Sequence, residues 1–168
     1  LLKNGRVVHG RAVAINAAEV VMAGGQSIDA DAIVVATGSH YASPFKPQGD
    51  SAADFKEQIA KIAAKVTAAD QVVIVGAGAV GVELAGEIKA VHPHKSVALV
   101  SNQPRLFPVY PEKLHNKLVA RLSALGVALY LGQPASGLDQ TEVPYQGTVT
   151  LADGTALSGL IVPAIGAK

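Results

Sequence analysis

A glycine-rich turn between an apolar strand and a helix constrains this chain most. Residues 71–87 read QVVIVGAGAVGVELAGE, in which a β-branched run leads into Gly76-x-Gly78-x-x-Gly81 and then into a helical pattern. Gly76 suits the turn, Gly78 lets the main chain approach a pyrophosphate, and Gly81 allows close packing of helix on strand. The pyrophosphate would lie on free N–H groups at the helix start. We therefore predict a dinucleotide site whose motif residues are Gly76, Ala77, Gly78, Ala79, Val80 and Gly81.

The segments around this motif predict an α/β fold, a Rossmann-like doubly wound parallel sheet. A helix capped by Asp50 or Ser51 precedes the strand at 72–75, and further strands are expected at 97–100 and 127–131. A helix from about Pro111 joins the last two strands. This β-α-β-α-β order is typical of a mononucleotide-binding half, which we assign to a domain of residues 50–168. The apolar face of the helix after the motif is expected to be Val80, Leu84, Ile88 and Val91.

The first 49 residues predict a small antiparallel β-meander followed by a proline-containing linker. The meander ends in an apolar run at 33–35, which we expect to be a buried strand. Segments 22–38 and 151–166 share a glycine turn, an apolar strand and a terminal A-x-G. We interpret them as an internal repeat in which each copy closes a separate nucleotide-binding domain. The alternative is convergence, because unrelated hairpins also favour glycine turns.

Composition limits the function classes. The chain has 168 residues, of which 49% are hydrophobic and 16% charged, so it can bury a sizeable core. A net charge of +1 gives no electrostatic basis for binding nucleic acid or an anionic membrane. The absence of cysteine removes disulfides and thiolate metal sites, and no apolar run approaches the roughly 20 residues that span a bilayer. Because it starts without Met inside a strand-like pattern, we interpret the chain as a fragment.

The residues at the end of the second predicted parallel strand bear on the choice between NADH and NADPH. NAD enzymes usually place an acid there, about 20 residues after the motif, on the ribose 2′-hydroxyl. This chain has Ser101, Asn102 and Arg105 instead, so we expect both NADH and NADPH to bind. Arg105 could pair with a 2′-phosphate, or it could be a solvated loop charge. No metal site is predicted, because His92 and His94 flank a proline and lack helical i,i+4 spacing.

Three stretches carry a family resemblance: VVATGSHYASPF, VVIVGAGAVGVELAGEIKAVHPHKSVALVSNQPRLFP and DGTALSGLIVPAIG. They resemble the FAD-dependent pyridine nucleotide oxidoreductases with two dinucleotide domains, in the apoptosis-inducing-factor-like and type II NADH dehydrogenase branch that includes the ferroptosis suppressors. The resemblance implies hydride transfer from NAD(P)H to FAD, and electron transfer to a quinone or similar acceptor. It also implies that residues 1–49 end the first FAD segment and that residues 50–168 form the inserted NAD(P)H-binding domain.

The resemblance assigns roles to individual residues. Ala36, Thr37 and Gly38 would pack against FAD, and Glu83 would lie near the nicotinamide as the catalytic residue. The alternative for Glu83 is a stabilising charge on the first turn of its helix. Gly166 closes the second A-x-G, where Ile165 replaces a threonine hydroxyl, so its expected cofactor contact is weaker.

Two other classes of protein are compatible with the same residues. A disulfide or ferredoxin reductase of the same architecture would share these features, as would a non-catalytic nucleotide-sensing protein. FAD binding is expected only of the parent protein, because the glycine fingerprint of the FAD domain and its later G-D motif are not in this sequence. A cytoplasmic or membrane-peripheral location is favoured, and membrane contact of the parent is left open.

Overall fold

The computed structural model describes residues 4–38, 46 and 51–166. The chain divides into two compact units, Leu1–Gly38 and Ser39–Lys168, which are described separately. Apart from Lys46, the expected linker and its boundary at residue 49 lie outside the described residues.

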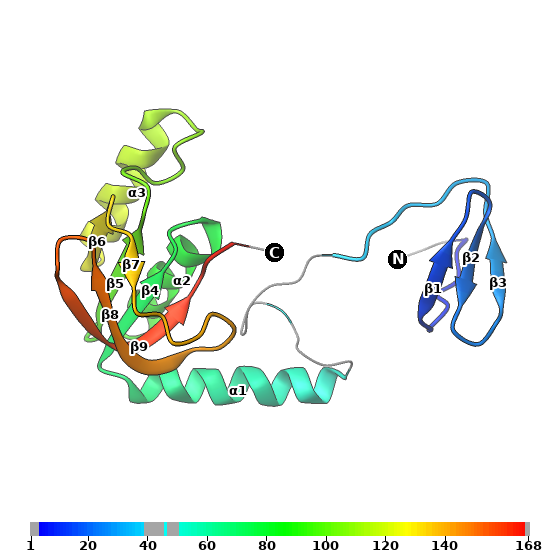
Figure 1. Ribbon diagram of the computed structural model, residues 1–168, viewed down its shortest axis with the longest axis horizontal. Coiled ribbons are helices and arrows are strands. Elements are labelled where there is room, and N and C mark those ends of the chain that lie inside the picture. Colours follow the sequence, from blue (N-terminus) through cyan, green and yellow to red (C-terminus); the bar gives the residue numbers. More distant parts are fainter. Residues whose placement is uncertain (1–3, 39–45, 47–50, 167–168) are drawn as a thin grey trace. The chain divides into compact units, whose positions relative to one another are not determined.

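The first unit is the expected antiparallel meander. Its strands are β1 (Ala12–Ile15), β2 (Glu19–Met22) and β3 (Ser27–Asp29), paired in the order β1-β2-β3 (Figure 1). The prediction of a buried strand at 33–35 is wrong for this structure: the segment has no strand pairing, and Val34 and Val35 are 87% and 62% exposed. A buried strand needs neighbours on its edges and faces, and the described strands of this unit pair only among themselves.

The second unit contains a six-stranded sheet of order β6-β5-β4-β9-β8-β7. The parallel strands are β4 (Gln71–Val75), β5 (Ser96–Ser101), β6 (Val127–Leu131) and β9 (Ala156–Pro163). The antiparallel strands β7 (Ala135–Ser136) and β8 (Tyr145–Leu151) extend the sheet beyond β9. The predicted Rossmann-like order is therefore confirmed.

Alternate residues of β4 pack into two hydrophobic clusters, one on each face of the sheet. Val72 and Ile74 pack in one cluster with Ala85 and Ile88 of helix α2 (Ala79–Val91). Val73 and Val75 join a second cluster with residues of β8 and β9. Helix α3 (Glu112–Ala124) buries Leu122 in the first cluster and ends before Gly126, which has the left-handed φ of +79° expected of a helix terminator.

The buried face of α2 differs from the expected one. Its buried residues are Gly81, Ala85, Ile88 and Lys89. Of the expected stripe only Ile88 is fully buried, and Val91 is 68% exposed. The small side chains of Gly81 and Ala85 let the helix approach the sheet closely, and the larger Val80 and Leu84 are only partly buried.

Helix α1 (Ala52–Ala68) lies along the second unit (Figure 1). Its predicted cap is confirmed, since Ser51 Oγ accepts the Asp54 N–H at 3.0 Å. Lys95 is 3% exposed, and its Nζ donates to the carbonyl oxygens of Thr67 at 2.8 Å and Ala69 at 2.7 Å. This buried ammonium therefore ties the end of α1 to the turn after α2.

Candidate functional site

The glycine turn is fixed by strands on both sides. Gly76 has a φ of +114°, and its N–H donates to the Val100 carbonyl oxygen of β5 at 2.9 Å. The preceding carbonyl, of Val75, accepts the Ala164 N–H at 2.7 Å. A Cβ on Gly76 would overlap the carbonyl oxygen of Ala164. Both the backbone angle and the close approach therefore require glycine here.

The next two glycines of the motif differ in the space around their Cα atoms. Gly78 caps α2, and a Cβ there would meet nothing within 4 Å. Gly81 is buried, and its Cβ would overlap the Gly76 carbonyl oxygen. The closed position, Gly81, is the one predicted to allow close packing of helix on strand, and the open position, Gly78, is the one predicted to let a pyrophosphate approach. Gly78 has a φ of −73°, so its requirement is for space and not for a left-handed backbone.

The start of α2 leaves backbone donors free for a ligand. The first hydrogen bond of the helix runs from the Val82 N–H to the Gly78 carbonyl oxygen at 3.0 Å. The N–H groups of residues 79–81 precede that bond and have no partner within the helix. Together with the helix dipole, they favour an anion.

A pocket of about 330 Å³ lies at this edge of the sheet. Three segments meet there: the glycine turn, the end of β5 with its loop, and the end of β9. The carboxyl edge of parallel strands is where ligands bind in open α/β sheets. The pocket is lined by Gly76, Ala77, Gly78, Ser101, Asn102, Gln103, Arg105, Phe107, Pro108, Val109, Ala164, Ile165 and Gly166.

This lining joins most of the predicted nucleotide residues. Gly166 comes from the far end of the chain, and Ser101, Asn102 and Arg105 come from the predicted ribose segment. The remaining motif residues, 79–81, belong to the start of α2 and do not line the pocket. The sequence did not predict that the loop residues Phe107, Pro108 and Val109 line the pocket. In the structure Val109 is 89% exposed, which is unusual for its residue type.

Charge and hydrogen bonding in the pocket suit a negative ligand. Arg105 is the one charged side chain among the described residues that line it, and none of them is acidic. Its Nη2 donates to the Pro108 carbonyl oxygen at 3.0 Å. Ser101 is buried, and its Oγ accepts the Gln103 N–H at 3.1 Å, whereas Asn102 is exposed. Asn102 and Gln103 are therefore the exposed uncharged polar residues of this pocket, and Arg105 supplies its positive charge.

Glu83 lies outside this pocket. The expectation that it occupies the first turn of its helix is wrong, since that turn holds no acid; Glu83 is the fifth residue of α2 and is exposed. Ala36, Thr37 and Gly38 belong to the other unit, where all three are exposed. The roles expected for these four residues stay predictions.

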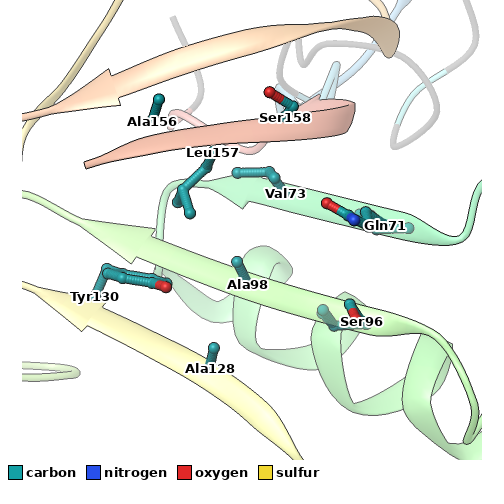
Figure 2. Close-up of a pocket in the computed structure, with 11 residues that line it drawn as sticks. Gln71, Val73, Ser96, Ala98, Ala128, Tyr130, Ala156, Leu157 and Ser158 are labelled. Carbon is teal, nitrogen blue, oxygen red and sulfur yellow. The ribbon is translucent and has the colours of Figure 1, made fainter.

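A second hollow lies on one face of the sheet, with a volume of about 250 Å³ (Figure 2). Val73, Ala98, Tyr130 and Leu157 point into it from four strands, β4, β5, β6 and β9. Gln71 and Ser96 place it toward the beginning of the parallel strands. It has neither the glycine turn nor the free helix amides of the first pocket, so the first pocket is the stronger candidate site.

The described residues offer neither a metal-binding group nor a membrane-spanning helix. No three His, Cys, Asp or Glu side chains gather there as a metal-binding group. Within the same part of the chain, no helix combines the length and hydropathy needed to cross a bilayer.

The sequence resembles longer curated proteins. It is 36% identical over 155 residues to the FAD-dependent oxidoreductase FVFD30 of Flammulina velutipes, covering 89% of this chain and 46% of that protein. It is 31% identical to ferroptosis suppressor protein 1 of Xenopus tropicalis (87% and 41% covered), and 29% identical to apoptosis-inducing factor 1 of Saccharomyces cerevisiae (79% and 38% covered). The chain thus spans less than half the length of each of these relatives.

Solved structures share the fold. The crystal structure of the ferredoxin reductase for the CYP199A2 system from Rhodopseudomonas palustris matches with a TM-score of 0.67 at 23% identity, covering 95% of this chain and 41% of that one. The family model described as pyridine nucleotide-disulphide oxidoreductase matches residues 2–168, nearly the whole chain. The relatives also agree with the resemblance seen in the sequence. The chain therefore belongs to the pyridine nucleotide-disulphide oxidoreductase family, in its apoptosis-inducing-factor-like branch.

Proposed function

We propose that the second unit binds NAD(P)H and orients it within a longer FAD-dependent oxidoreductase. The observation that carries this proposal is the open space at Gly78, beside the free amides of α2 and in a pocket where Arg105 is the one charged side chain among the described lining residues. A pyrophosphate needs this combination of close main-chain approach and positive potential. Family membership supports the same conclusion.

The residues of this chain would bind and align the cofactor. The glycine turn and residues 79–81 would hold the pyrophosphate, and Asn102 and Arg105 would contact the adenosine ribose. NAD(P)H supplies a hydride and FAD accepts it, so the chemistry belongs to the cofactors. Ala36, Thr37 and Gly38 would face FAD in the whole protein, and Glu83 would lie near the nicotinamide. We further propose a quinone or similar small molecule as the electron acceptor.

Titration of the purified 168-residue chain with NADH, NADPH and FAD tests the proposal. We expect stoichiometric binding of NADH and no tight binding of FAD. Gly78→Val should abolish NADH binding and leave the unfolding midpoint close to that of the unmodified chain, because its side chain would fill ligand space and its backbone stays at negative φ. Gly86→Val is the matched control, since Gly86 also has open space around its Cβ and lies on the same helix. Unchanged NADH affinity in folded Gly78→Val would refute the phosphate site.

Cofactor preference gives a finer test. We expect NADH and NADPH affinities to agree within about tenfold, or about 1.4 kcal/mol, because the described residues of the pocket include no acid that would repel a 2′-phosphate. Asn102→Asp should weaken NADPH binding much more than NADH binding. The exposed Asn102 is a better test than Ser101, where a new carboxylate would be buried. Arg105→Ala should act in the same direction more mildly. Equal effects on both cofactors would place the ribose elsewhere.

A further inference from the structure

The loop after β5 holds one residue in an unfavourable conformation. Phe107 has a φ of +50°, and among the described residues it is the only non-glycine residue with a positive φ. A left-handed backbone is costly for a bulky side chain, so the surroundings must hold it in place. Phe107 and its neighbours Pro108 and Val109 line the pocket at the glycine turn. The conformation of this loop therefore shapes one wall of that pocket.

Several contacts hold the loop, and one of them comes from helix α3. Within the loop, Arg105 Nη2 donates to the Pro108 carbonyl oxygen at 3.0 Å, and the Tyr110 N–H donates to the Phe107 carbonyl oxygen at 2.9 Å. From α3, His115 Nδ1 accepts the N–H of Leu106 at 3.1 Å. This bond is made at the residue directly before the strained position.

The bond from His115 has no simple substitute. Leu106 is 1% exposed, so its N–H has little access to water if the acceptor is lost. Imidazole Nδ1 accepts a hydrogen bond only when it carries no proton, so His115 acts here as an acceptor. The buried Leu106 side chain anchors the loop to the core, and the Nδ1 bond sets the direction of the backbone that enters Phe107.

We infer that His115 is a positioning residue for the nucleotide pocket. It accepts the Leu106 N–H and so holds residues 105–108 in the conformation that forms the pocket wall. His115 does not itself line the pocket, and it acts on the ligand through the loop. The inference rests on the proposed function to the extent that the ligand is NAD(P)H.

The test uses three variants of the full 168-residue chain. His115→Leu removes the acceptor while raising helix propensity, and His115→Asn keeps an acceptor atom near the position of Nδ1 at similar helix propensity. Asn116→Leu is the control, since Asn116 is the exposed neighbour on the same helix. Two quantities are measured: the hydrogen-exchange rate of the Leu106 amide by NMR, and the dissociation constant for NADH.

We expect His115→Leu to speed exchange of the Leu106 amide about tenfold, the size of effect that one buried hydrogen bond produces. The NADH dissociation constant should rise about three- to tenfold. His115→Asn should restore both quantities to within about twofold of the unmodified chain, and Asn116→Leu should change neither. Rescue by asparagine would show that the hydrogen-bond acceptor of His115 matters, because leucine would replace the packing of the side chain better than asparagine does.

Two results would overturn the inference: unchanged Leu106 exchange in folded His115→Leu, or faster exchange with unchanged NADH affinity. If His115→Leu does not fold, His115→Ala removes the same acceptor with a smaller side chain and is judged by the same criteria. An unmodified chain that binds no NADH overturns the proposed function alone. The exchange comparison needs no ligand, so it still decides whether His115 fixes the loop.

Discussion

The two glycine-turn hairpins of this chain, residues 22–38 and 151–166, share a turn and differ in what lies beside them. In the first, the Gly25 N–H donates to the Met22 carbonyl oxygen; in the second, the Gly154 N–H donates to that of Leu151, both at 2.9 Å. The two glycines have φ values of +80° and +86°. The turn is therefore the same local structure made twice.

After the turn the two copies diverge. In the second copy β9 continues to Pro163, paired with β4 on one edge and β8 on the other, and Ile161 and Val162 are at most 2% exposed. In the first copy the corresponding run has no strand pairing, and Val34 is 87% exposed. The contrast shows that a hairpin needs only its own sequence, whereas a buried strand needs neighbours supplied by distant segments.

Hydrogen exchange should show the largest contrast between the two copies. The amides of Ile161 and Val162 lie in the centre of the sheet, so their exchange should require global unfolding of the second unit. Those of Val34 and Val35 should exchange near the unstructured rate. We expect a ratio of at least about a thousandfold in protection, measured by NMR. Similar protection in both segments would contradict the difference in pairing.

A buried charge should distinguish the copies in stability. Val162→Asp places a carboxylate at a site that is 2% exposed, so it should cost more than about 4 kcal/mol of unfolding free energy. Val34→Asp, at the matching exposed position, should change the unfolding free energy by less than about 0.5 kcal/mol. Urea denaturation measures both. If Val162→Asp is unfolded from the start, Val162→Ala should still lose about 1–3 kcal/mol.

The ends of the two copies should tolerate a methyl group differently. The second copy closes against the glycine turn, where Gly76→Ala would combine a φ of +114° with overlap of the Ala164 carbonyl oxygen. We expect a cost of about 2–4 kcal/mol by urea denaturation. Gly38→Ala ends the first copy, also at positive φ, but nothing lies within 4 Å of its Cβ. We expect at most about 2 kcal/mol at Gly38, the cost of a positive φ alone, and a larger loss would reveal contacts that the structure does not show.

The smallest difference lies in the turns themselves, where Asp153 of the second copy stands in the position of Gly24. Asp153 Oδ1 accepts the Thr155 N–H at 2.9 Å, and this backbone hydrogen bond lowers the pKa of the exposed carboxyl group. A lowered folded-state pKa means that the stabilisation is present above the unfolded pKa and is lost as pH falls through the folded one. The unfolding midpoint of Asp153→Gly should therefore lie slightly below that of the unmodified chain at pH 7. The gap should close below about pH 4, and a gap that persists in acid would point to a backbone effect of glycine.

Local sequence determined the turns, caps and individual secondary-structure elements of this protein. The strand, glycine turn and helix around Gly76, the cap at Ser51 and both hairpin turns follow from residues close together in the chain. Their backbone angles, capping bonds and spacing depend on neighbours within a few positions. The candidate pocket was predictable to the same extent, because parallel strands bring their carboxyl ends to one edge and so join residues 76–78 with residues 101–105.

Only the tertiary structure decided how these elements meet. The apolar pattern of α2 predicted that Val80 and Leu84 would be buried. The sheet instead packs against Gly81 and Ala85, because small residues permit the closest approach of helix and strand. Phe107 lies in the pocket wall next to Leu106, whose N–H donates to His115 of helix α3, and no local sequence pattern encodes that contact. The apolar run at 33–35 has the composition of a buried strand, yet Val34 and Val35 are exposed here, because burial is a property of the partner surface as well as of the segment.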